Sequence, residues 1–238
     1  ICVPCSVEND LAVIDSSFGF GSALSGALES IQSAVVESRC APNGVGIVSV
    51  TGKHSGYLAC HSVLASSNVC ACLIPESAFI LYGPNGLLEY LYKVVHRNGY
   101  AVIVVAEGAA KSLLHPSVPK INPPVADSNN TDYASMVEFT YDTGISPSEW
   151  IKGEIERYFK ARQNPATIRI ISALTACRSM PANPTDRVHC LSLSNNAVHA
   201  AMYGYTSFSS AIVNNRSVLI PASIISRDSP ASLSLEGR

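Results

Sequence analysis

The chain opens with ICVPCSVEND, in which two cysteines stand close to two acidic residues. Cys2 and Cys5 have the CxxC spacing that redox dithiols and zinc sites use. A redox dithiol normally lies where a strand enters a helix, whereas SVENDLAVIDSS follows here, and a zinc site needs a second pair of ligands. We therefore interpret both cysteines as ordinary thiols, with a redox or a zinc site as the alternatives.

Two carboxylates follow the cysteines, since Glu8 and Asp10 flank Asn9 in an expected loop. Carboxylates at alternate positions of a loop at a strand end can serve as a base and as a metal ligand. The pattern is compatible with a catalytic loop, but surface loops often carry two acids that only meet solvent.

The sequence TGKHSG (51–56) places Gly52 and Gly56 around Lys53, between an expected strand and an expected helix. Such a turn presents backbone N–H groups, a helix N-terminus and a cation, which together suit a phosphate group. The pattern differs from a P-loop, which has a longer spacing and Lys followed by Ser or Thr. An ordinary glycine turn with a solvated lysine is the alternative.

Three further charged residues are candidates for binding a sugar phosphate. Glu107 ends an apolar strand, where ligand sites of open α/β sheets lie, and its carboxylate can accept a hydrogen bond from a sugar hydroxyl. Arg169 and Arg178 lie in and after the next strand, and a guanidinium group matches phosphate geometry well. A solvated acid and surface salt bridges are the alternatives.

Composition limits the classes of protein to which the chain can belong. Its 238 residues suffice for one large or two small domains. Charged residues make up only 14% and hydrophobic residues 47%, which indicates extensive burial within the chain or against partners. The net charge of −2 gives no indication of a nucleic-acid-binding surface. No apolar run approaches the roughly 20 residues that a membrane span requires.

Strand and helix patterns alternate along the chain and predict an α/β fold with layers of helices around a mainly parallel sheet. Ser16 or Ser17 is expected to cap the first helix. The expected helices are at 20–35, 55–66, 87–98, 147–162 and 185–203, and the expected strands are at 46–50, 70–75, 101–108, 167–172, 209–213 and 216–220. We expect one domain over 1–222 with a long surface excursion at 109–147, followed by a flexible tail at 223–238.

Several of these segments, in order, resemble phosphofructokinases, especially the plant-like branch that includes pyrophosphate-dependent relatives. VPCSVENDLAVIDSSFGFGSAL is similar to the family stretch VPKTIDND…DKTFGFDTA, and TGKHSG is similar to MGRxSG. The segments CLIPE, GPNGLL and GYAVIVVAEGA match family sequences nearly unchanged. CRSMPANPTDRVHC with NNAVHAAMYGYTSF resembles MIRAxPSNxSD followed by AVHGAMAGYTG. The resemblance implies a Rossmann-like layered fold of the phosphofructokinase type, covering its sugar-phosphate-binding portion.

The family transfers a phosphoryl group from ATP or pyrophosphate to fructose 6-phosphate, and this implies roles for individual residues. Glu8 takes the position of the catalytic base and Asp10 that of the second acid of the same loop, with Asp10 also a candidate Mg²⁺ ligand if the protein is active. The resemblance implies that the remaining candidates bind the substrate: Ser6, Gly52, Lys53, Glu107, Arg169 and Arg178. Arg169 is expected to reach a neighbouring subunit's site.

The chain departs from the family pattern at several of these positions. Glu8 replaces an Asp, Lys53 an Arg, Thr51 a Met, Thr175 a Tyr or His, and Cys5 a Lys. No glycine-rich nucleotide loop is found, so the ATP or pyrophosphate site is expected outside this chain. We therefore expect a non-catalytic family member that is a structural or regulatory subunit of a larger assembly and needs no cofactor.

The alternative is the sugar-phosphate half of an active enzyme that uses Mg²⁺. The kinship implies an intracellular protein, of the cytosol or of an organelle such as the plastid or mitochondrion.

Overall fold

The computed structural model describes residues 1–109 and 146–234, and the expected excursion at 109–147 therefore lies almost wholly outside the described residues. The first part contains α1 (Phe20–Arg39), β1 (Gly44–Val50), α2 (Tyr57–Ala65), β2 (Ala71–Leu73), α3 (Leu87–Asn98) and β3 (Tyr100–Ala106). The second part contains α6 (Pro147–Ala161), β4 (Thr167–Ser172), α7 (Leu174–Ser179), α8 (Pro184–Met202), β5 (Phe208–Val213), β6 (Arg216–Pro221) and α9 (Ala222–Asp228).

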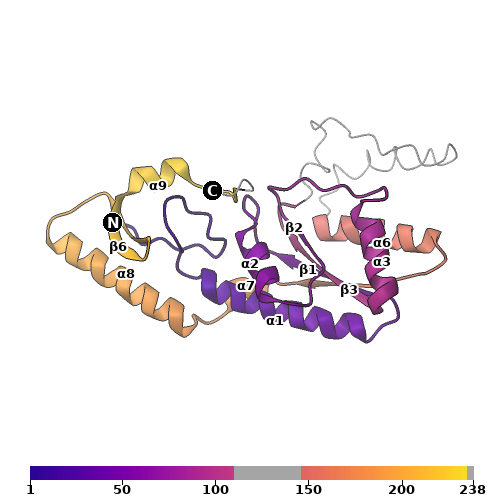
Figure 1. The fold of residues 1–238 in the computed structure, drawn as a ribbon. Helices are drawn as coiled ribbons and strands as arrows, with labels where there is room; N and C mark the ends of the chain where they lie inside the picture. Colours follow the sequence, from indigo (N-terminus) through magenta and orange to yellow (C-terminus); the bar gives the residue numbers. More distant parts are fainter. Residues whose placement is uncertain (110–145, 235–238) are drawn as a thin grey trace.

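Four strands form a parallel sheet in the order β2-β3-β1-β4, which confirms the expected α/β fold. The two central strands, β1 and β3, are buried almost throughout, as strands covered on both faces must be. Helices α1 and α2 pack together on one side of the sheet, and α3 and α6 lie together on the other (Figure 1). A continuous apolar core, with Ile47, Ile103 and Ile151 inaccessible to solvent, fills the layers between them.

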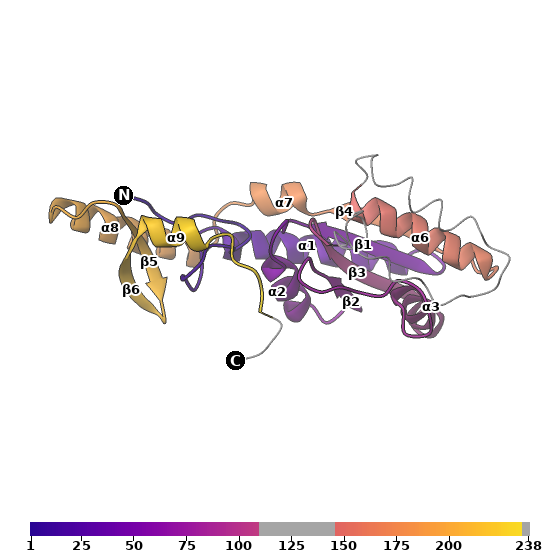
Figure 2. The same cartoon turned by 90° about the horizontal axis from the view of Figure 1, so that it is seen from above.

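The elements that follow α7 extend away from the sheet. Strands β5 and β6 pair as a separate antiparallel hairpin, and α8 and α9 lie near it, at the end where the N-terminus also lies (Figures 1 and 2). The buried Asp186 near the start of α8 joins this part to α1, because its Oδ2 accepts hydrogen bonds from the backbone N–H of Ser22 at 2.7 Å and from its hydroxyl at 2.5 Å.

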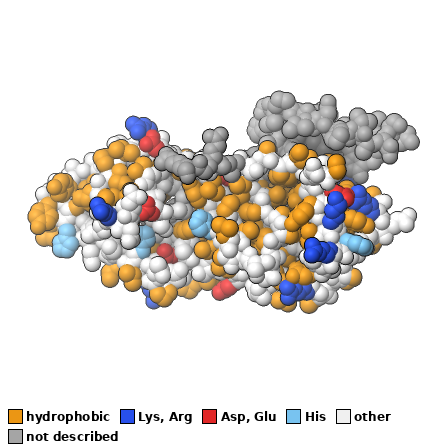
Figure 3. All heavy atoms as spheres, viewed as in Figure 1, with side chains coloured by type: hydrophobic (Ala, Val, Ile, Leu, Met, Phe, Trp, Pro, Cys, Tyr) orange, Lys and Arg blue, Asp and Glu red, His pale blue; other side chains and the backbone are white. Residues whose placement is uncertain are grey.

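Hydrophobic side chains are exposed at the end of the molecule where α8 lies (Figure 3). The exposed apolar side chains of α8 are Val188, Leu191, Val198 and Met202, with Met202 82% accessible. Within the described residues, no helix combines the length and apolar character that crossing a membrane would need.

Three details differ from the sequence expectations. Helix α1 begins after Gly19, whose φ of 101° suits glycine, and neither Ser16 nor Ser17 caps it; Ser17 is instead buried and donates from its hydroxyl to the carbonyl of Ser6 at 2.6 Å. Helix α7 lies in a segment for which the sequence analysis expected no helix. The segment expected to be a flexible tail includes α9, whose Ile225 packs in a small apolar cluster with Ala211 and Ile220 of the hairpin. The boundary of the single domain stays a prediction.

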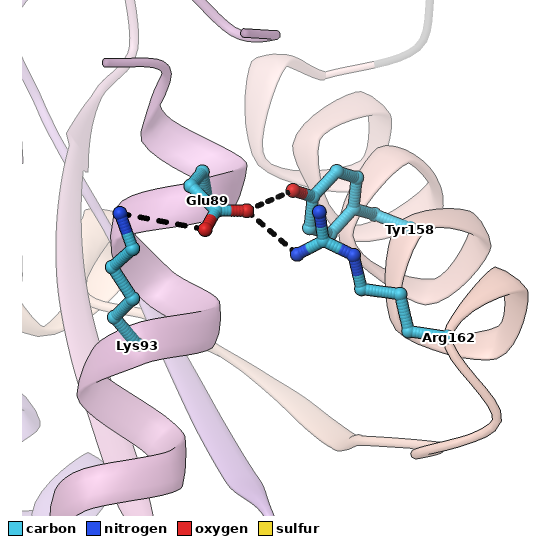
Figure 4. A network of polar contacts seen from close by, with 4 residues as sticks. All are labelled: Glu89, Lys93, Tyr158 and Arg162. Atoms are coloured by element: carbon cyan, nitrogen blue, oxygen red, sulfur yellow. Dashed lines mark hydrogen bonds and ion pairs between the residues drawn. The ribbon is translucent and has the colours of Figure 1, made fainter. Parts of the chain in front are cut away.

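Helices α3 and α6 are joined by a polar cluster around Glu89 (Figure 4). The Tyr158 hydroxyl donates to Glu89 Oε2 at 2.6 Å, Arg162 Nη1 lies 2.7 Å from the same oxygen, and Lys93 Nζ lies 3.4 Å from Oε1. The Arg162 guanidinium also lies over the Tyr158 ring, 4.2 Å from its centroid. The hydrogen bond from Tyr158, followed by that from Arg162, lowers the pKa of Glu89 to about 2.

Glycines shape the turns that follow the central strands. The Gly108 N–H donates to the carbonyl of Gly52 at 2.8 Å, which joins the turn after β3 to the turn after β1. A Cβ on Gly108 would lie 2.2 Å from the carbonyl oxygen of Lys53, and a Cβ on Gly52 would lie 2.4 Å from that of Ser55. Both turns therefore require a residue without a side chain.

We predict that Gly108→Ala destabilises the full-length gene product by about 1–3 kcal/mol, because the added methyl group must displace the Lys53 backbone. The matched control is Gly153→Ala within α6, where the nearest atom is Arg157 Nη2 at 3.6 Å and where alanine adds up to about 1 kcal/mol of stability. Urea unfolding of the two variants measures both effects. Equal midpoints would contradict the close packing of the two turns.

A second prediction concerns pH and Glu89. The unfolded chain protonates this carboxyl near its ordinary pKa of 4.5 and the folded protein only near 2, so its stabilising effect is complete above about pH 5 and is lost as pH falls toward 2. The difference in unfolding free energy between the unmodified protein and Glu89→Gln should therefore shrink over this range, as urea titrations at pH 7, 5 and 3 measure. The exposed Glu156→Gln is the control, and a Glu89→Gln difference that is independent of pH would contradict the assignment.

Candidate active site

The acidic loop, residues 6–10, is held in shape by its own polar side chains. The Ser6 hydroxyl donates to Asp10 Oδ1 at 2.7 Å and accepts the backbone N–H of Glu8 at 3.2 Å. Asn9 has a positive φ of 54°, which asparagine tolerates better than most residues, and its Oδ1 accepts the N–H of Ser17 at 2.8 Å. The loop is thus a fixed structure in which Glu8 and Asp10 share one neighbourhood.

Parallel pairing places Lys53 and Glu107 side by side. The register of β1 and β3 ends at Val50 opposite Ala106, so Thr51 and Glu107 emerge from adjacent strands at the same edge of the sheet. The Glu107 N–H donates to the Val50 carbonyl at 2.9 Å, and Lys53 Nζ lies 3.5 Å from Glu107 Oε1. The lysine side chain is 62% exposed and that of Glu107 28%, so this ion pair lies at the margin of the site.

Two polar atoms at this edge are buried and have no hydrogen-bond partner within residues 1–109 and 146–234. They are Thr51 Oγ1 and Glu107 Oε2. Buried polar groups in native proteins nearly always have a partner, so such atoms mark a place where a ligand or a water molecule can complete the hydrogen bonding. A hydroxyl and a carboxylate oxygen suit the hydroxyl groups of a sugar.

Electrostatics connects the acidic loop to both strand ends. Partial burial is the largest cause of the raised pKa of Glu8, followed by the neighbouring Asp10 carboxylate, with Glu107 adding to the effect. The backbone N–H of Lys53 and the Arg178 guanidinium act in the opposite direction. Glu8 therefore interacts with the charges of Asp10, Glu107 and Arg178, and Lys53 joins the group through its backbone N–H and its ion pair with Glu107.

Arg178 reaches this group because α7 starts almost directly after β4. The Ala173 N–H donates to the Ser49 carbonyl of β1 at 2.8 Å, and α7 follows at Leu174. Arg169 is placed differently: it is exposed, and it pairs with Gly46 in the middle of β1, about 13 Å along the strand from Val50. The structure thus groups Arg178 with the candidates and leaves Arg169 apart, and contact of Arg169 with a neighbouring subunit stays a prediction.

A divalent cation would find few protein ligands here. In the described part of the chain, no three His, Cys, Asp or Glu side chains lie together as a metal site would need. Glu8 and Asp10 provide one or two carboxylates, which suits Mg²⁺ when substrate phosphates and water supply the other oxygen ligands. Asp10 is thus compatible with a metal shared with a phosphate group.

The CVPC cysteines contribute to pairing between segments. The backbone of Cys2 forms an isolated β-bridge with Ser209 of β5, and that of Cys5 forms one with Phe18. Both cysteines are exposed free thiols.

Sequence reasoning missed four residues that support the site, namely Asn9, Ser17, Ser55 and Glu76. Asn9 between two acids carries a local sign of a left-handed turn. Ser17 and Glu76 carry none, because they bond to residues 11 and 20 positions away.

Comparison with known proteins identifies relatives of this chain. The family model described as phosphofructokinase matches residues 1–201. ATP-dependent 6-phosphofructokinase 7 of Arabidopsis thaliana is 38% identical over 219 residues, which are 92% of this chain and 42% of that protein. The ATP-dependent 6-phosphofructokinase of Amycolatopsis methanolica is 39% identical over 228 residues, which are 95% of this chain and 48% of that protein. The chain thus spans less than half the length of these relatives.

Solved structures share the fold. Phosphofructokinase from Saccharomyces cerevisiae superposes with a TM-score of 0.66 at 21% identity, over 93% of this chain and 26% of that one. Pyrophosphate-dependent phosphofructokinase from Nitrosospira multiformis gives a TM-score of 0.64 at 19% identity, over 94% of this chain and 51% of that one. With the family model covering most of the chain and the sheet and helices matching in space, this protein belongs to the phosphofructokinase family.

Proposed function

We propose that this chain forms the sugar-phosphate-binding part of a phosphofructokinase-family protein whose phosphoryl transfer is weakened or lost. The observation that carries the proposal is the grouping of Glu8, Asp10, Lys53, Glu107 and Arg178 at the carboxyl ends of the central strands. Ligand sites of open α/β sheets lie at this edge.

The proposed ligand is fructose 6-phosphate. Arg178 and Lys53 supply two positive charges for its phosphate, and a guanidinium group can bind phosphate through two parallel hydrogen bonds. Glu107 Oε2 and Thr51 Oγ1 are buried acceptors that sugar hydroxyls can satisfy. The acidic loop would then face the hydroxyl that receives the phosphoryl group, and Glu8 would accept its proton.

Two features support weakened catalysis. Glu8 is one methylene longer than the Asp of the family pattern, which shifts the carboxylate by roughly an ångström, and a misplacement of that size can cost about 100-fold in rate. Lys53 replaces an Arg, so the forked geometry is lost, and its ammonium group lies against Glu107. Both differences affect groups that must be positioned accurately for phosphoryl transfer.

The second candidate function is an active 6-phosphofructokinase that transfers a phosphoryl group from ATP or pyrophosphate. The raised pKa of Glu8 favours it, since partial burial and a neighbouring carboxylate make Glu8 a stronger base. Mg²⁺ would be held by Asp10 together with the phosphates, and would offset their negative charge. The phosphoryl donor would bind largely outside the residues of this chain.

The proposal extends to the assembly and the compartment. The exposed apolar side chains of α8, including Leu191 and Met202, support a role as a subunit of a larger complex. Relatives from Arabidopsis thaliana are named chloroplastic, which supports an intracellular protein of the cytosol or plastid.

The test compares turnover of fructose 6-phosphate by the full-length gene product with ATP and with pyrophosphate. We predict slow or absent turnover with both donors and an increase of about 10- to 100-fold in Glu8→Asp, because aspartate restores the shorter reach of the base. Glu8→Gln controls for the carboxylate, and the unfolding midpoints of all three proteins control for stability. Turnover at the level of active relatives by the unmodified protein, with no gain in Glu8→Asp, would contradict the proposal and favour the active enzyme.

A further inference from the structure

The segment of residues 229–234 makes hydrogen bonds both to the acidic loop and to residues beside the start of α2. It follows α9, whose buried Ile225 packs against Ala211 and Ile220 in a small apolar cluster that Leu11 and Ile14 border. The segment therefore starts from a fixed position beside the residues that follow the acidic loop.

One end of the segment holds the acidic loop through two hydrogen bonds. Ser229 Oγ accepts the backbone N–H of Ala12 at 2.9 Å, and the Ala231 N–H donates to the carbonyl of Asp10 at 2.6 Å. These contacts fix the end of the loop that carries Glu8 and Asp10.

The other end holds the start of α2 through Glu76. Glu76 Oε1 accepts two backbone N–H groups, that of Gly56 at 2.8 Å and that of Leu233 at 3.0 Å. The Tyr57 hydroxyl also donates to the carbonyl of Ser232, at 3.4 Å. Gly56 ends the turn that carries Lys53, so this carboxylate joins the segment to the turn. Glu76 Oε2 is buried and lacks a hydrogen-bond partner in the described residues, so the carboxylate is held there by the two N–H groups on Oε1.

The acidic loop and the turn also touch directly. The Ser55 hydroxyl lies 3.5 Å from the Glu8 carbonyl, at the limit of a hydrogen bond, and the Lys53 N–H interacts with the Glu8 carboxylate. The C-terminal segment adds a second connection with shorter hydrogen bonds at both ends.

We propose that residues 229–234 form a clasp that holds the acidic loop 6–10 and the turn 51–56 in a fixed position relative to each other. Glu76 is the positioning residue that connects the clasp to the turn. Glu76 acts through Gly56 and Leu233 and does not touch the substrate. The role in sugar-phosphate binding rests on the proposed function, whereas the mechanical coupling of loop and turn does not.

Hydrogen exchange of the full-length gene product tests the coupling without a substrate. Glu76→Ala is expected to speed exchange of backbone amides not only in the turn 51–56 but also in residues 6–17, by about fivefold, the effect of losing one typical hydrogen bond. Ser229→Ala should in turn speed exchange in the turn 51–56. Glu76→Gln, which keeps an oxygen acceptor, should restore most of the protection, and Ser226→Ala on the exposed side of α9 serves as the control.

A double variant separates a clasp from two unrelated local effects. If the segment acts as one unit, Glu76→Ala combined with Ser229→Ala should speed exchange no more than the stronger single variant. Exchange in residues 6–17 that is unchanged in Glu76→Ala, or additive effects in the double variant, would overturn the clasp.

Titration with fructose 6-phosphate then tests its role in binding. The dissociation constant for fructose 6-phosphate is expected to rise about fivefold in Glu76→Ala, because the variant loses one hydrogen bond. It should rise much less in Glu76→Gln, which keeps an oxygen acceptor. If the unmodified protein fails to bind fructose 6-phosphate while the exchange results hold, the proposed function fails and the clasp stands. Equal binding of fructose 6-phosphate by the unmodified protein and by Glu76→Ala, despite faster exchange in the variant, would overturn the positioning role of Glu76.

Discussion

The parallel pairing of β1 with β3 is the constraint on which the candidate site depends. Its register ends at Val50 opposite Ala106, and this alone places the turn that carries Lys53 beside the strand end that carries Glu107. The hydrogen bond from the Gly108 N–H to the Gly52 carbonyl extends the pairing beyond the strands. Glycine is needed at position 108 because a Cβ there would collide with the Lys53 backbone. A shift of register by one residue would turn each side chain to the other face and separate these charges.

Under the proposed function, the balance of charge at this edge would let the chain bind a phosphate and yet perform chemistry poorly. Three carboxylates, Glu8, Asp10 and Glu107, lie among two cations, Lys53 and Arg178. A phosphate group adds negative charge, so it must compete with Glu107 for the ammonium group of Lys53. An arginine could bind carboxylate and phosphate together through separate N–H groups, whereas a lysine presents a single compact charge.

Much of the fold could be predicted because it follows from local patterns. The apolar runs of β1 and β3 and the Ser146-Pro147 start of α6 carry clear signals, and Ser146 does accept the Glu149 N–H as a cap. The short helices α7 and α9 were not predicted, since they have only 6 and 7 residues and each buries only one side chain, Cys177 in α7 and Ile225 in α9. Their positions depend on packing against distant parts of the chain.

The candidate site was predicted only in part, for the same reason. The family resemblance indicated Glu8, Lys53, Glu107 and Arg178, and the structure brings these residues together. The hydrogen bonds of buried Ser17 to Ser6 and of Glu76 to Gly56 and Leu233 join residues that are remote in sequence. No local sequence pattern predicts these hydrogen bonds. Arg169 lies apart from the group because β4 pairs with β1 in a register that places it in mid-strand.

A crystal structure of the full-length gene product with fructose 6-phosphate would show whether the grouped charges at the carboxyl ends of β1 and β3 bind the sugar phosphate. We predict the phosphate group beside Arg178 and Lys53, and a sugar hydroxyl within hydrogen-bond distance of Glu107 Oε2. A sugar phosphate bound elsewhere, with Glu107 Oε2 and Thr51 Oγ1 still unpartnered, would contradict it.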